Sequence, residues 1–157
     1  MSKHGQNLGM SDARTLDLWN DMARATAAVR ARLAALFDAS VGLLPEEVDL
    51  LMSLEAAAEQ RLRMADVSRA LQLSKSGVTR LVDRLVLRGL VVRAACPSDR
   101  RVVYAGLTAE GRDVLDEAAP LLRAGLAEHL GRHLDAGELD AARIALSKIL
   151  AAEGAGA

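Results

Sequence analysis

The chain has few aromatic residues, one cysteine and no long apolar run, and each scarcity narrows what it can be. Its 157 residues include three aromatic side chains, Trp19, Phe37 and Tyr104, so we expect packed helices with a core of Leu, Val and Ala rather than an aromatic-lined cofactor pocket. The lone Cys96 excludes an intramolecular disulfide framework and favours a reducing cytoplasm. No segment approaches the ~20 apolar residues of a membrane span, so we expect no membrane partner.

Charge is nearly balanced in total but segregates along the chain. The formal net charge is −1. Residues 61–104 contain ten Lys and Arg against three Asp, and the rest contains ten basic and eighteen acidic residues. A basic middle between acidic flanks predicts a surface for a polyanion on a scaffold that stays soluble.

Apolar periodicity predicts helices on both sides of the basic segment. Residues 12–38 place apolar or small side chains at steps of three and four, as in one long helix. A second helix begins at Pro45, with Glu46 and Glu47 at the positive end of its dipole. Its predicted buried face contains Leu50, Leu51 and Leu54. Two more helices are predicted over 109–152, the first capped by Thr108 and the second opened by a capping box.

The basic segment itself reads as a helix-turn-helix followed by a hairpin. "RMADVSRALQL" and "SKSGVTRLVDRLVLRGL" predict two short helices joined almost directly, with Ser74 as the N-cap of the second and Gly89 as its stop. The apolar face of the second contains Val78, Leu81, Val82, Leu85 and Val86. "LVVRAA" and "RVVYAGL" then predict two strands, with "CPSDRR" at the tip of the hairpin.

These elements predict a mainly α fold with a small β-hairpin wing, in a single domain over 1–157. The winged helix-turn-helix occupies 45–107, and its wing occupies 90–107. The long helices at 12–38 and 109–152 have more apolar surface than one winged helix needs, so we expect them to form a homodimer.

A recognition helix enters the major groove of DNA with its N-terminus first, which selects the candidate contacts. The predicted DNA-binding residues of the second short helix are Ser74, Lys75, Ser76, Thr79, Arg80 and Arg84. The two serines suit phosphate oxygens at a helix N-terminus, and Arg80 has the planar fork that binds guanine O6 and N7 together. At the hairpin tip, Arg100 is expected to enter a minor groove, while Asp99 pairs with Arg101 and braces the wing.

Three motifs, "LSKSGVTRLVDRLVLRGLVVR", "DRR" and "LTAEG", together resemble those of MarR-type transcriptional regulators, over nearly the whole chain. The resemblance implies a dimeric winged-helix protein that binds double-stranded DNA, usually a repressor released or altered by a small ligand or by oxidation. By position, Ser74, Ser76, Thr79 and Arg80 match the family's recognition helix. Asp99 and Arg101 match its wing Asp-x-Arg pair, and Arg100 matches its minor-groove residue. The resemblance also implies an effector cavity, whose residues it does not identify here.

The sequence also contains residues that could carry other chemistry. A reactive Cys96 would need Arg93, Arg100 and Arg101 close to its thiol, and without a second cysteine we expect an incidental turn residue. His129 and His133 are spaced i, i+4 on the predicted fifth helix, near Glu128 and Asp135, a spacing that suits one metal ion. We nevertheless predict no metal and no cofactor. No nucleophile or phosphate-loop motif occurs, so we predict no enzyme. The alternative function is a winged helix whose basic face binds an acidic protein.

Overall fold

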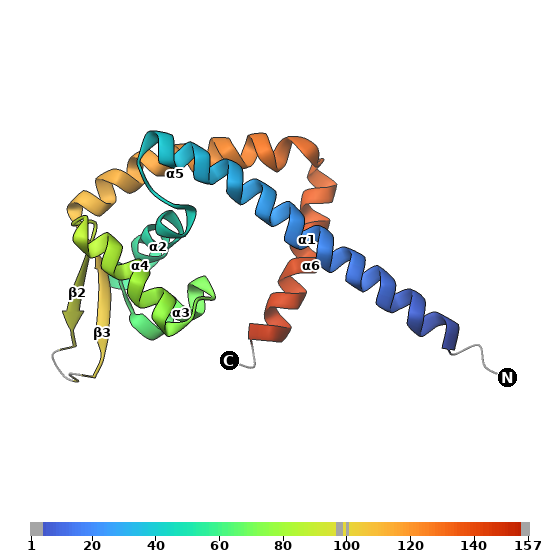
Figure 1. The fold of residues 1–157 in the computed structure, drawn as a ribbon, viewed down its shortest axis with the longest axis horizontal. Coiled ribbons are helices and arrows are strands. Elements are labelled where there is room, and N and C mark those ends of the chain that lie inside the picture. Colours follow the sequence, from blue (N-terminus) through green and yellow to red (C-terminus); the bar gives the residue numbers. More distant parts are fainter. Residues whose placement is uncertain (1–4, 97–98, 100, 155–157) are drawn as a thin grey trace. The chain divides into compact units, whose positions relative to one another are not determined.

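The structure is a computed structural model that describes residues 5–96, 99 and 101–154. It divides the chain into two compact units, residues 33–124 and residues 1–32 with 125–157, which we describe separately. The fold is mainly helical with one small sheet, as predicted. No helix among the described residues is both long and apolar enough to cross a membrane. The elements are α1 (Gly5–Ser40), α2 (Pro45–Ala56), η1 (Ala58–Gln60), β1 (Arg61–Arg63), α3 (Met64–Leu71), α4 (Lys75–Leu87), β2 (Val91–Ala95), β3 (Val103–Leu107), α5 (Ala109–His129), η2 (Gly131–His133) and α6 (Ala136–Gly154) (Figure 1).

The core of the 33–124 unit is built from aliphatic side chains and one phenylalanine. Its largest fully buried side chains include Phe37, Leu43, Leu50, Leu51, Leu54, Leu85 and Leu115. Helix α2 begins at Pro45, which lacks the N–H that a first helical residue would leave unpaired. The three leucines predicted for its buried face are all buried, so that prediction is confirmed.

Helices α3 and α4 form the predicted helix-turn-helix. Helix α3 is followed by its C-cap Gln72, whose left-handed backbone (φ 53°) turns the chain, and the side chain of Ser68 donates a hydrogen bond to the carbonyl of Leu73. Ser74 then caps α4, because its Oγ accepts a hydrogen bond from the amide of Gly77 at 3.2 Å. The predicted apolar face of α4 is buried except at Val86, which is 36% exposed because the core-facing stripe ends at Leu85.

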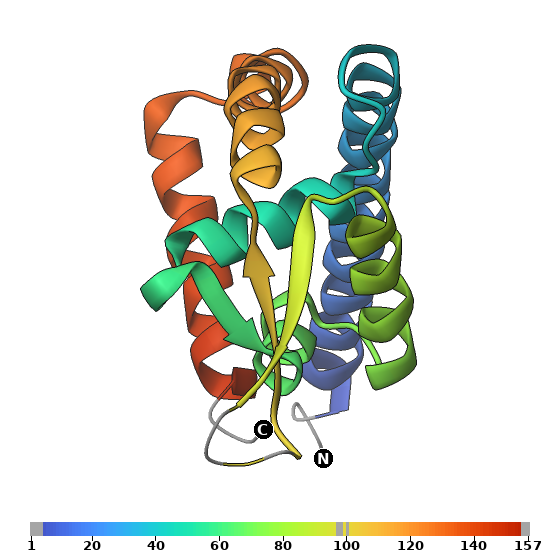
Figure 2. The ribbon, with the colours of Figure 1, turned by 90° about the vertical axis from the view of Figure 1, so that its left-hand side faces the viewer.

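Three strands, rather than the predicted two, form the sheet. The order is β1-β3-β2 with both pairings antiparallel, and Figure 2 shows the strands side by side. Strand β1 is three residues long and has the sequence Arg-Leu-Arg, so it has no run of β-branched residues that would have predicted it. Ala105 of β3 is buried, and its register partner Arg93 therefore projects toward the helices.

The two ends of the wing meet the start of α5 in a tight junction. Gly89 adopts φ 74° and ends α4, as predicted, and Thr108 donates its hydroxyl to the Gly89 carbonyl at 2.7 Å. The amide of Thr108 donates to the carbonyl of Leu90 at 3.2 Å, while its Oγ caps α5 by accepting from the amide of Gly111 at 2.9 Å. A Cβ on Gly111 would lie 3.0 Å from the carbonyl carbon of Leu90, with the oxygen closer still, so this position has no room for a side chain.

The unit of residues 1–32 and 125–157 contains most of α1, the end of α5, η2 and α6. Helix α1 extends beyond the predicted 12–38 at both ends. Helix α6 opens with the predicted capping box, since the amide of Glu138 donates to Asp135 Oδ1 and the amide of Asp135 donates to Glu138 Oε2, each at 2.9 Å. Many large apolar side chains of these helices are exposed in the single chain, among them Leu16, Leu18, Trp19, Ile144, Ile149 and Leu150.

Candidate nucleic-acid interface

The N-terminal turn of α4 has the local structure that an anion-binding helix end requires. The cap oxygen of Ser74 lies 3.2 Å from the hydroxyl of Ser76, and both side chains are exposed. A Cβ at Gly77 would lie 3.3 Å from Ser74 Oγ, so glycine leaves the cap uncrowded. The first amides of a helix, together with two hydroxyls beside them, form a donor set suited to phosphate oxygens.

Lys75, Thr79 and Arg80 are exposed on the first two turns of α4. Thr79 donates its hydroxyl back to the carbonyl of Lys75 at 2.9 Å, which fixes its rotamer and leaves its methyl group accessible. Within the part of the chain that the structure describes, no hydrogen bond or ion pair engages the guanidinium of Arg80 or the ammonium of Lys75. Their charges are available to an incoming anion.

Arg84, predicted as a DNA contact one turn beyond Arg80, is placed differently. Its Nε donates to Oε1 of Glu47 at 3.1 Å, and its Nη2 lies 3.7 Å from Oε1 of Glu46. The two carboxylates at the start of α2 therefore balance its charge. Sequence reasoning gave Glu47 only a dipole role, because its burial and its partner 37 residues away depend on tertiary packing.

The wing is tied to α4 by Arg93. Its Nη2 lies 2.9 Å from Asp83 Oδ1 and donates to the Thr79 carbonyl at 3.2 Å, so a β2 side chain joins two points on α4. At the tip, Asp99 Oδ1 accepts a hydrogen bond from the backbone amide of Arg101 at 3.0 Å. The predicted bracing pair thus meets through the backbone of Arg101. Arg100 lies outside the described residues.

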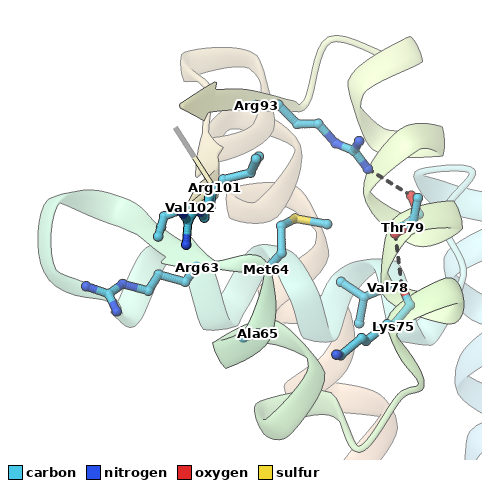
Figure 3. A pocket seen from close by; sticks show the side chains of 10 residues that line it. Arg63, Met64, Ala65, Lys75, Val78, Thr79, Arg93, Arg101 and Val102 are labelled. Carbon is cyan, nitrogen blue, oxygen red and sulfur yellow. Dashed lines mark hydrogen bonds between the residues drawn. The ribbon is translucent and has the colours of Figure 1, made fainter. Parts of the chain in front are cut away.

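A cavity of about 500 Å³ lies between the α3–α4 pair and the wing (Figure 3). Its lining residues are Arg63, Met64, Ala65, Lys75, Val78, Thr79, Arg93, Arg101, Val102 and Val103. The charged members of this lining are all basic, and the rest are mostly apolar. Two predicted residues of α4, Lys75 and Thr79, therefore line the same cavity as the predicted wing residue Arg101.

Sequence reasoning missed the contribution of β1 to this basic surface. The guanidinium of Arg61 lies 5.1 Å from the ring centroid of Tyr104 and that of Arg63 lies 6.0 Å from it. Arg63 Nε donates to the Tyr104 hydroxyl at 3.3 Å, and this hydrogen bond raises the pKa of Arg63 above its usual value. The sequence did not indicate strand β1, which pairs Arg63 with Tyr104 across the sheet.

The side chains considered for other chemistry do not gather into a site. Helix α5 ends at His129 and His133 lies on η2, so the two imidazoles are not one turn apart on a single helix, and that placement was wrong. Glu128 forms an ion pair with Arg132. Over the described ranges, no group of three or more His, Cys, Asp and Glu could hold a metal ion. Cys96 is half-buried, and its amide donates to the Val102 carbonyl at the end of the hairpin.

Comparison with known proteins places the same segment in a sequence family. The MarR family model matches residues 41–102. HTH-type transcriptional repressor MdtR of Bacillus subtilis is 30% identical over 112 residues, 71% of this chain and 71% of its own. Multiple antibiotic resistance protein MarR of Escherichia coli is 31% identical over 54% of this chain and 59% of its own. The chain spans about half the length of several other curated relatives that it matches.

Solved structures extend the similarity to most of the chain. Sco3205, a MarR family transcriptional regulator from Streptomyces coelicolor crystallised with DNA, is 26% identical with a TM-score of 0.80, over 90% of this chain and 91% of its own. BpsR of Bordetella bronchiseptica, whose DNA binding is regulated by 6-hydroxynicotinic acid, is 25% identical with a TM-score of 0.74, over 83% of this chain and 90% of its own.

Proposed function

Because this chain belongs to the MarR family, we propose that it is a sequence-specific DNA-binding transcriptional regulator and not an enzyme. The observation that carries the proposal is the α4 N-terminus, where a capped helix end is followed by the exposed charges of Lys75 and Arg80. The DNA complex of the structurally similar Sco3205 supports it.

In the proposed complex α4 enters the major groove with its N-terminus first. Ser74 and Ser76 bind phosphate oxygens together with the first amides of the helix, and Lys75 adds a phosphate contact. Arg80 donates to the O6 and N7 atoms of one guanine, and Thr79 contacts a neighbouring base edge. Arg100 enters the adjacent minor groove, and Asp99 and Arg101 hold the turn that presents it.

The proposed assembly is a homodimer. Its support is that α1 and α6 expose several large apolar side chains in the single chain, which a partner subunit would cover. Two protomers would place their recognition helices about 34 Å apart, one turn of the double helix, and would read the half-sites of a pseudo-palindrome.

The proposed outcome of binding is repression that a small molecule relieves. The names of MdtR and of the E. coli relative MprA support repression, and BpsR supports control of DNA binding by a small ligand. Such a ligand acts by favouring the state of the protein that fits DNA less well.

The test is selection of binding sites from random duplexes with the full chain, at low and moderate salt. We expect enrichment of an inverted repeat and an affinity that falls steeply as salt rises, because phosphate contacts release counterions. Arg80→Ala should relax the preference at one base of each half-site, with a loss of about 1–3 kcal/mol at that base. Failure to enrich any sequence at low salt would contradict the proposal and favour an acidic protein as the partner.

A further inference from the structure

Glu47 stands out because it is the one charged side chain that is buried in the described part of the chain. Its Oε2 accepts the amide of Leu44 at 2.9 Å, and its Oε1 accepts Nε of Arg84 at 3.1 Å. Nη1 of Arg88 lies 3.7 Å from Oε2. A buried carboxylate is tolerated only when such partners replace its lost hydration, so the three side chains depend on one another.

Arg88 extends this cluster to the turn between α1 and α2. Its Nη1 donates to the carbonyl of Gly42 at 2.7 Å and its Nη2 to the carbonyl of Val41 at 3.4 Å. The backbone amides of Val41 and Gly42 both donate hydrogen bonds to the carbonyl of Phe37 in the same turn. Gly42 has the positive φ (62°) that this type of helix C-terminus requires. The residue that follows α4 is thus hydrogen-bonded to the turn that follows α1.

Arg80 and Arg84 lie one turn apart on α4, yet their surroundings differ. Although its side chain is 48% exposed, Arg84 is held by Glu46 and Glu47 through Nη2 and Nε, so a phosphate would have to compete with two carboxylates for its charge. Arg80 has no polar partner among the described residues. Arg80 therefore precedes Arg84 by a single helical turn. Any rotation of α4 that breaks the contacts of Arg84 with Glu46 and Glu47 also moves Arg80.

We propose that Glu47, Arg84 and Arg88 form a positioning cluster that fixes α4 to the α1–α2 turn and so sets the orientation in which Arg80 meets a base. Arg84 is a positioning residue in this scheme, not a DNA contact. The inference rests on the proposed function, because it concerns the same helix on the same DNA.

The test measures binding of the full chain to its selected duplex and to a scrambled duplex at several salt concentrations, by fluorescence anisotropy. Arg84→Gln should weaken specific binding by about tenfold, the effect expected of one lost charge-assisted hydrogen bond, and leave scrambled-duplex binding within about twofold. The slope of log affinity against log salt should not change. Lys75→Ala is the comparator: as a phosphate contact it should weaken both duplexes alike and reduce the slope by about 0.9.

Two further variants separate positioning from a loss of fold. Arg84→Lys keeps a cation beside Glu47 and should recover part of the specific affinity that Arg84→Gln loses. The double variant Glu47→Gln with Arg84→Gln should bind no more weakly than the worse single variant, because one broken pair leaves nothing for the second change to remove. Thermal unfolding of each variant identifies any that fails to fold, and the two Arg84 variants decide alone if Glu47→Gln unfolds.

The inference is overturned if Arg84→Gln weakens both duplexes equally and lowers the salt slope, since Arg84 then contacts phosphate. It is also overturned if the effects of Glu47→Gln and Arg84→Gln add. If the parent chain selects no duplex, the proposed function fails first. If the parent selects DNA and only the Arg84 results disagree, the positioning role fails by itself.

Discussion

Replacing Gly111 with alanine should destabilise the winged lobe strongly, although alanine is the better helix former. The new Cβ would lie 2.9 Å from Cδ1 of Leu107 and 3.0 Å from the carbonyl carbon of Leu90, where carbon atoms normally keep about 3.5–4.0 Å. Overpacking of this kind costs about 1–3 kcal/mol. If α5 retreats, the two hydrogen bonds from Thr108 to Gly89 and Leu90 are lost, at about 1 kcal/mol each.

A partial shift of α5 incurs both costs, about 3–5 kcal/mol in total, and alanine returns at most about 1 kcal/mol through helix propensity, so the net loss is about 2–4 kcal/mol. For a chain of this size that lowers the unfolding midpoint by about 4–16 °C, measured by far-UV circular dichroism at one protein concentration. Gly137→Ala is the comparator, because Gly137 also lies in the first turn of a helix and its Cβ would meet one side-chain oxygen, Oδ1 of the capping Asp135, at 3.3 Å rather than backbone. An unchanged midpoint for Gly111→Ala, beside a neutral or stabilised control, would refute the close-contact reasoning.

Three further predictions concern the α4 cap, the wing and α6. Ser74→Ala should cost about 1 kcal/mol of stability by removing the α4 cap, whereas Ser74→Asp should keep the cap but weaken DNA binding; equal stability of all three proteins would show that the cap is idle. Arg100→Ala should weaken binding to the flanks of the site without changing the core motif, measured by site selection, and parent-like binding would remove the wing from the interface. Leu150→Glu changes a side chain that is 71% exposed in the single chain, so it should leave folding intact and abolish self-association in sedimentation, and a persistent dimer would exclude α6 from the interface.

Local chemistry made much of the fold predictable from sequence. Ser74 and Gly89 mark the limits of α4 because one supplies a cap oxygen and the other tolerates a left-handed backbone. Thr108 and the pair Asp135 and Glu138 mark helix starts in the same way. These signals lie within three or four residues of the structure that they specify.

The features that sequence reasoning missed depend on partners far along the chain. Strand β1 exists because Arg61–Arg63 pair with β3 more than 40 residues away. The engagement of Arg84 by Glu47 depends on how α2 packs against α4. In the sequence, Arg80 and Arg84 are two equivalent arginines on one helix face. Both are exposed, and only the tertiary structure shows that Arg84 is held by carboxylates of α2.

Trp19 is the only tryptophan in the chain, and its side chain is 66% exposed on α1. Its emission therefore comes from one known place, without a fluorescent label. A subunit that covers this face moves the indole out of water and shifts its emission to shorter wavelengths. The wing tyrosine, Tyr104, lies in the other unit, on β3. The scarcity of aromatic residues thus gives the protein a built-in optical signal for assembly, which can be recorded separately from DNA binding.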